Sequence, residues 1–99
     1  MAAYWISFRL ADDRDYTQRY EALMEAIRQL STKWWTEPTA FIVFESASKI
    51  DAVATAVKQV IDEAVDIVLI GMPEYKDARA IGAIQDGDIF TLMPFTKKA

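Results

Sequence analysis

The chain of 99 residues contains no cysteine and no histidine. These absences exclude disulfide bonds, thiolate nucleophiles, imidazole acid–base catalysis and the zinc sites that these two residue types usually form. Any chemistry would have to use carboxylates, amines, hydroxyls or backbone groups. The chain also lacks a glycine-rich phosphate-binding loop, so we do not expect nucleotide hydrolysis.

Clustered positive charge is scarce as well. The formal net charge is -4, and the lysines and arginines are dispersed, with only Lys97 and Lys98 adjacent. Nonspecific affinity for nucleic acid rests on clustered basic side chains. The composition therefore argues against broad nucleic-acid binding and leaves weak or local contacts as an alternative.

Long apolar runs are missing too. The N-terminal stretch "YWISFRL" is too short to span a membrane, lacks a basic leader and is followed closely by Asp12 and Asp13. We therefore expect a cytoplasmic protein without membrane contact. With 53% hydrophobic and 26% charged residues the chain has a globular composition, and its length fits a single domain over residues 1–99.

Hydrophobic periodicity predicts alternating strands and helices. Strands show alternation with period two, whereas the two helices each show one apolar stripe at helical spacing. The predicted elements are a strand over Tyr4–Leu10, a helix from about Arg14 to Leu30, an extended segment over Lys33–Thr36, a strand over Thr39–Glu45, a helix over Ile50–Ala64, a strand over Asp66–Gly71 and a strand over Ile89–Phe95.

The order strand, helix, strand, strand, helix, strand predicts an α+β fold of the ferredoxin-like kind. In that arrangement two helices pack on one face of an antiparallel sheet. The segment over Ile89–Phe95 would add a fifth strand at the C-terminal end. Residues 72–85 give mixed signals and fit a short helix, an edge strand or an ordered loop.

The predicted strands are apolar on both faces. Phe41 and Val43 alternate with Ile42 and Phe44, although helices would cover only one face. An apolar patch of this extent usually marks an interface. We therefore predict a homodimer through the open sheet face. The expected interface residues are Trp5, Trp34, Trp35, Phe41 and Val43.

Two details of this interface remain open. In the alternative interpretation, residues 72–95 fold back and cover the same face within one chain. Adjacent residues of a strand point to opposite faces, so Trp34 and Trp35 cannot form one aromatic surface. One tryptophan should pack under the helices, and the other should lie on the open face or at its rim.

The run "FRLADDRD" places three carboxylates after the first strand. Asp12 and Asp13 are candidate helix N-caps, and Asp15 would interact favourably with the helix dipole. Carboxylates can also bind a hard cation such as Mg²⁺. Arg9, at the end of the strand, either pairs with an acidic side chain of its own or another subunit or contacts a phosphate.

Several motifs resemble the small CRISPR-associated adaptation proteins, which have a ferredoxin-like fold, dimerise and accompany the integrase. The similar stretches are "FRLADDRD", "PTAFIVFES" and "DIVLIG". A closer likeness is to the uncharacterised SinR-like members of that superfamily. The residues that match this group are Tyr20, Glu21, Ala22, Ile27, Trp34, Trp35, Ile42 and Val43.

The resemblance has a direct implication for activity. Members of the family and the related toxin ribonucleases have been described as metal-dependent nucleases, with a carboxylate at the end of the first strand. This chain has Arg9 at that position, and a guanidinium would oppose a bound cation. We therefore predict a non-enzymatic, homodimeric interaction or scaffold protein without a cofactor. Its expected further partners are another protein or, with weak affinity, nucleic acid.

The alternative interpretation is a ribonuclease or toxin-like endonuclease that depends on Mg²⁺ or Mn²⁺. In that case Asp12 or Asp13 would replace the missing carboxylate. The capping role of these residues competes with this interpretation, because it accounts for the same acidic run without a metal.

Overall fold

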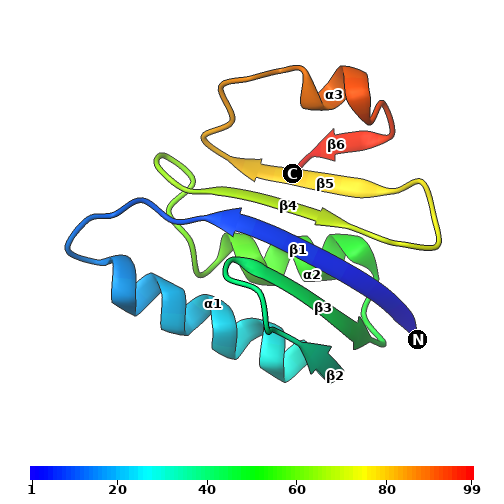
Figure 1. The fold of residues 1–99 in the computed structure, drawn as a ribbon, viewed down its shortest axis with the longest axis horizontal. Coiled ribbons are helices and arrows are strands. Elements are labelled where there is room, and N and C mark those ends of the chain that lie inside the picture. Colours follow the sequence, from blue (N-terminus) through cyan, green and yellow to red (C-terminus); the bar gives the residue numbers. More distant parts are fainter.

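Six strands and three helices alternate along the chain in the computed structural model, which describes all 99 residues (Figure 1). The order of the elements agrees with the predicted one up to β4. The elements are β1 (Ala2–Arg9), α1 (Tyr16–Leu30), β2 (Ser31–Trp35), β3 (Phe41–Ser46), α2 (Ile50–Lys58), β4 (Ile67–Gly71), β5 (Ala78–Gly82), α3 (Ile89–Leu92) and β6 (Thr96–Lys98).

The strands form one mixed sheet in the order β2-β3-β1-β4-β5-β6. All neighbouring pairs are antiparallel except β5 and β6, which run parallel. Edge strand β2 pairs with β3 through an irregular register, with a shift between Ser31 and Lys33. In Figure 1 helix α2 lies behind the central strands, and no helix lies in front of β1 and β3.

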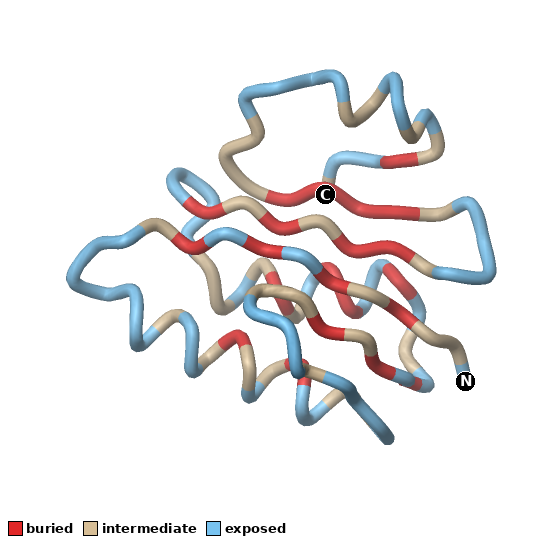
Figure 2. Tube along the Cα trace, viewed as in Figure 1, coloured by how far each residue is buried: buried red, intermediate tan, exposed pale blue.

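The core lies between the sheet and the two long helices. Tyr4, Ile6 and Phe8 of β1 are buried in alternation, as Figure 2 shows for β1, β3 and β4. They join one cluster with Leu23 of α1 and Val53 of α2. Burial of each such side chain contributes about 1.5–3 kcal/mol. The apolar stripes predicted for the helices are therefore the faces that pack on the sheet.

The predicted C-terminal strand over Ile89–Phe95 is wrong. Ile89–Leu92 form the short helix α3, and the strand β6 begins only at Thr96. The backbone N–H of Leu92 donates to the carbonyl of Asp88, and Pro94 has no N–H to donate to a strand partner. The sheet consequently has six strands instead of five, and its last pair is parallel.

The undecided segment over residues 72–85 contains a strand. β5 pairs with β4 along its whole length, from Ile67 opposite Gly82 to Gly71 opposite Ala78. Its sequence is "ARAIG", whose small residues give little hydrophobic alternation. The C-terminal segment thus extends the sheet sideways and does not lie over β1 and β3 (Figure 1).

Helix boundaries also differ from the prediction. Helix α2 ends at Lys58, well before Ala64, because a turn over residues 62–65 precedes β4. Neither long helix has a side-chain cap: Asp15 and Lys49 occupy the N-cap positions. The predicted N-cap positions of Asp12 and Asp13 are therefore wrong: the Asp13 side chain accepts the backbone N–H of Asp15 one turn earlier and also has the role described below.

Gly82, the last residue of β5, lies against the backbone of Asp66 and Ile67 at the start of β4. Its φ angle is +99°, a conformation that residues with a side chain rarely adopt. A Cβ atom at this position would lie 2.0 Å from the carbonyl oxygen of Asp66. Both constraints act on backbone atoms, so a side chain cannot be accommodated by a rotamer change.

We expect Gly82→Ala to lower the free energy of unfolding by at least about 2 kcal/mol, because strain and the backbone clash add. Urea denaturation at neutral pH measures this loss. Gly87→Ala is the matched control, since nothing lies within 4 Å of a Cβ atom there. Equal stability of the two variants would contradict the role assigned to Gly82.

Candidate interaction surface

The sheet face opposite α1 and α2, called the open face here, carries the alternate residues of the three central strands. Residues that are paired across neighbouring strands point to the same side. The register of β1 with β3 and β4 therefore fixes the set without ambiguity. The open-face residues are Ala3, Trp5, Ser7 and Arg9 of β1, Phe41, Val43 and Glu45 of β3, and Ile67, Leu69 and Gly71 of β4.

Trp5 lies at the centre of the open face. Its neighbours across the strands are Val43 on one side and Gly71 on the other. The indole stacks against Phe41, with ring centroids 6.5 Å apart and planes at 21°. A Cβ atom on Gly71 would lie 2.2 Å from Cζ2 of Trp5. The indole therefore lies flat over β4, and this position depends on the absence of a side chain at Gly71.

The two adjacent tryptophans point to opposite sides of the sheet. Trp35 is paired with Val43 and lies on the open-face side, whereas Trp34 is paired with Phe44 on the helix side. Trp34 remains 36% exposed and Trp35 46% exposed, because β2 is an edge strand. The expectation that one tryptophan packs beneath the helices is therefore wrong, and Trp34 lies apart from the other four predicted interface residues.

Two shallow hollows flank the central aromatic residues. One, of about 380 Å³, lies around β2 and β3 and is lined by Ala3, Lys33, Trp34, Trp35, Val43, Phe44 and Glu45. The other, of about 270 Å³, is lined by Ile67, Leu69, Ile84, Gln85, Asp86 and Ile89. The sequence signalled Ile67 and Leu69 through strand alternation. It gave no signal for Ile84 and Ile89, which lie in a loop and a helix beyond the predicted core.

Arg9 is exposed at the C-terminal end of β1, opposite Ile67. Its side chain makes no hydrogen bond or ion pair within the chain. The exposed side chain of Asp12 has no partner either. Arg9 thus does not pair with Asp12 or Asp13 in its own chain. Of its expected roles, a contact with another subunit or with a phosphate remains.

Asp13 belongs to a cluster with Arg19 and the buried Asp66. Its two carboxylate oxygens accept hydrogen bonds from Nη1 and Nη2 of Arg19, at 3.0 and 3.1 Å. Nε of Arg19 donates to Oδ2 of Asp66 at 2.9 Å. The Arg19 guanidinium lowers the pKa of Asp13 below its ordinary value. Asp13 therefore stabilises the loop between β1 and α1.

Asp66 has no solvent-exposed surface, and its carboxylate is fully paired. Besides Arg19 it accepts the backbone N–H groups of Ala11 and Asp62, each at 2.8 Å. No local sequence pattern indicates this cluster, because Arg19 and Asp66 lie 47 positions apart. No three acidic side chains gather closely enough to hold a metal ion together.

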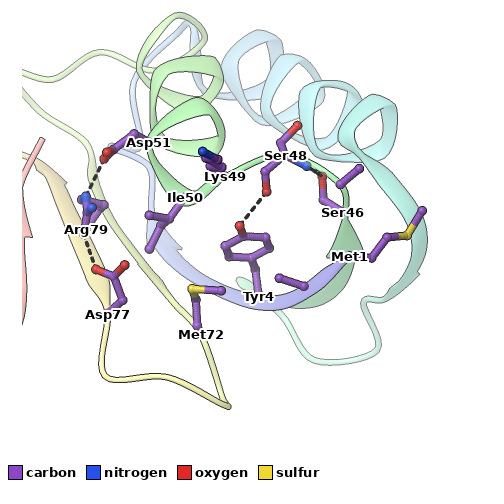
Figure 3. A pocket seen from close by; sticks show the side chains of 12 residues that line it. Met1, Tyr4, Ser46, Ser48, Lys49, Ile50, Asp51, Met72, Asp77 and Arg79 are labelled. Carbon is purple, nitrogen blue, oxygen red and sulfur yellow. Dashed lines mark hydrogen bonds and ion pairs between the residues drawn. The ribbon is translucent and has the colours of Figure 1, made fainter.

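A pocket of about 510 Å³ lies at the N-terminal end of α2 (Figure 3). Nε of Arg79 donates to Oδ1 of Asp51 at 2.7 Å, and Nη1 donates to Asp77. The hydroxyl of Tyr4 donates to the carbonyl of Ser48 at 2.6 Å. Burial, with a smaller effect from the charge of Asp77, raises the pKa of Tyr4. The pair of Arg79 and Asp51 links β5 to α2, and the hydrogen bond of Tyr4 links β1 to the loop before α2.

Comparison with protein-family models, curated proteins and solved structures finds no match. None of the helices has the length and apolar character required to cross a membrane. The candidate site therefore rests on its own geometry: a central apolar group on the open face, and two clusters of paired charges elsewhere that stabilise the fold.

We expect Asp66→Asn to lower the free energy of unfolding by about 3 kcal/mol, because the amide nitrogen that replaces one carboxylate oxygen cannot accept the hydrogen bonds made there and leaves buried donors without a partner. Urea denaturation at neutral pH measures the change. Asp12→Asn is the control, since the Asp12 side chain has no partner. A loss below about 1 kcal/mol would show that the cluster contributes little.

The lowered pKa of Asp13 predicts a pH-dependent contribution. Folding lowers the pKa of this carboxyl below its value in the unfolded chain, near 3.8. The ionised group therefore stabilises the protein fully at a pH above 3.8, and this contribution is lost as the pH falls through the lowered pKa. Asp13→Asn should therefore be less stable than the wild type at pH 7, and the difference should shrink progressively below about pH 4. Urea denaturation across this range measures it, and a constant difference would contradict the assignment.

Proposed function

We propose that the protein is a non-enzymatic, homodimeric interaction module, in which two copies associate through the open face. The supporting observation is the stacked pair Trp5 and Phe41 beside Val43 at the centre of a sheet face that no helix covers. Apolar groups gathered on an uncovered face favour association, because contact removes their surface from water.

The topology supports the resemblance to the ferredoxin-like adaptation proteins. The four strands β2, β3, β1 and β4 with α1 and α2 follow the order strand, helix, strand, strand, helix, strand. Both helices connect strands that are not neighbours, as in a split βαβ unit. In this proposal β5, α3 and β6 are additions to that unit. Arg9 at the end of β1 favours an interaction role over metal-dependent cleavage.

The size of the open face is compatible with a stable pair. The four strands β2, β3, β1 and β4, about 4.8 Å apart and five to eight residues long at about 3.3 Å each, give a face of roughly 20 Å by 16 to 26 Å. A standard interface buries about 800 Å² of accessible surface on each partner. The exposed ring of Trp35 on the edge strand β2 adds accessible surface beyond this flat area.

The adjacent tryptophans provide a test with a built-in control. Trp35→Ala should raise the dissociation constant of the dimer by roughly tenfold or more, because an aromatic side chain is lost from the open-face side. Trp34→Ala removes the same residue type from the other side and should leave the dimer unchanged. Sedimentation equilibrium at micromolar concentration measures both effects.

The wild type should sediment at twice the monomer mass of 11.2 kDa. A monomer mass at micromolar concentration would overturn the proposal, as would equal weakening by the two variants. Cleavage of RNA or DNA by the purified protein with Mg²⁺ or Mn²⁺, lost in Asp12→Ala, would replace it with the nuclease alternative.

A further inference from the structure

The open-face residues of the central strands include only two charged side chains, Arg9 and Glu45. Arg9 lies at the C-terminal end of β1, opposite Ile67. Glu45 lies next to the other end of β1, opposite Ala3. The stacked rings of Trp5 and Phe41 lie between these ends. The central strands thus carry a cation at one end of the open face and an anion at the other, where Lys33 of the edge strand β2 lies beside Glu45.

Both charges are available in the single chain. Arg9 has no ion pair, and Glu45 forms none with Lys33, its neighbour across β2 and β3. The hydroxyl of Thr32 donates to Oε1 of Glu45 at 3.1 Å and leaves Oε2 without a partner. Both side chains are exposed at the two ends of an apolar area.

We propose that a second copy docks on the open face with its strands reversed, so that Arg9 of each copy meets the partner's Glu45. This inference rests on the proposed dimerisation and adds its geometry. A symmetric face-to-face pair has its two-fold axis in the plane of the interface, and the two arrangements with aligned strands have this axis parallel or perpendicular to the strands. An axis parallel to the strands brings the same end of the strands together in both copies. If this axis ran along β1, Arg9 would face the partner's Arg9.

A perpendicular axis reverses the strands and brings opposite charges together at both ends. By symmetry the contact between Arg9 and the partner's Glu45 forms twice. Like charges in contact cost free energy, whereas complementary charges fix the register of an interface. Arg9 faces the partner's β1 in this arrangement, and the partner's Glu45 lies on the adjacent strand, within reach of its long side chain.

Apolar side chains meet in the same arrangement. Reversal exchanges the row of Trp5, Val43 and Gly71 with the row of Ser7, Phe41 and Leu69, since these rows are successive along the strands. The indole of Trp5, which lies over Gly71, then faces the partner's Leu69, and Phe41 faces the partner's Val43. Both contacts remove apolar surface from water.

Charge reversal tests the geometry. Arg9→Glu and Glu45→Arg should each raise the dissociation constant of the dimer by roughly tenfold or more, because each places like charges in contact. The double variant Arg9→Glu with Glu45→Arg should return the constant to within roughly threefold of the wild type. Sedimentation equilibrium at low salt measures all three, and circular dichroism verifies that they are folded. Arg14→Glu, exposed and outside the sheet, is the control.

The outcomes separate the geometry from dimerisation itself. A monomeric wild type overturns the proposed function and this inference together. A dimeric wild type whose affinity is unaffected by the single variants, or is not restored in the double variant, overturns the strand-reversed geometry and leaves dimerisation intact. Restoration in the double variant, with no effect of Arg14→Glu, supports the pairing of Arg9 with the partner's Glu45.

Discussion

The carboxylate of Asp66 is the interaction on which the arrangement of the chain depends most. It binds the loop after β1 through Ala11, helix α1 through Arg19, and the turn before β4 through Asp62. The backbone carbonyl of Asp66 accepts the N–H of Ala83, just after β5. A buried charge is costly to desolvate, and these hydrogen bonds offset that cost only while all of them form. The loop and helix that follow β1, the start of β4 and the end of β5 are thereby held together.

The same cluster decides how the acidic run after β1 is used. Arg19 lies between Asp66 and Asp13, so both oxygens of Asp13 are turned into the fold. Arg9, a few residues earlier, points from the opposite side of the strand and remains without a partner. One short segment therefore contributes a stabilising group to the helix side and a free cation to the open face.

The sequence predicted those parts of the fold in which local pattern and burial agree. Alternation in β1, β3 and β4 and the stripes of α1 and α2 identified the core, because one face of each element packs against another. β5 was not predicted, since small residues such as Ala78 and Ala80 give no contrast between faces. The error at Ile89–Phe95 arose because alternation outweighed Pro94. The pairing of Arg19 with Asp66 depends on tertiary contact, which no local spacing reveals.

The candidate surface was predictable to the same extent. Trp5, Phe41 and Val43 share a face because strand residues alternate, and this follows from the sequence alone. The opposite directions of Trp34 and Trp35 follow from the same rule. The flat placement of Trp5 over Gly71 could not be predicted from the sequence, because it depends on the register between β1 and β4.

The two edges of the sheet limit how copies of the chain can assemble. The register shift near Ser31 interrupts the β2 edge, while β6 at the other edge is only three residues long and bears Lys97 and Lys98. Short, interrupted or positively charged edges are poor templates for an added strand. Growth of the sheet from chain to chain is therefore discouraged. In the proposed association through the open face, each copy covers the apolar surface of the other, so a closed pair is the expected product.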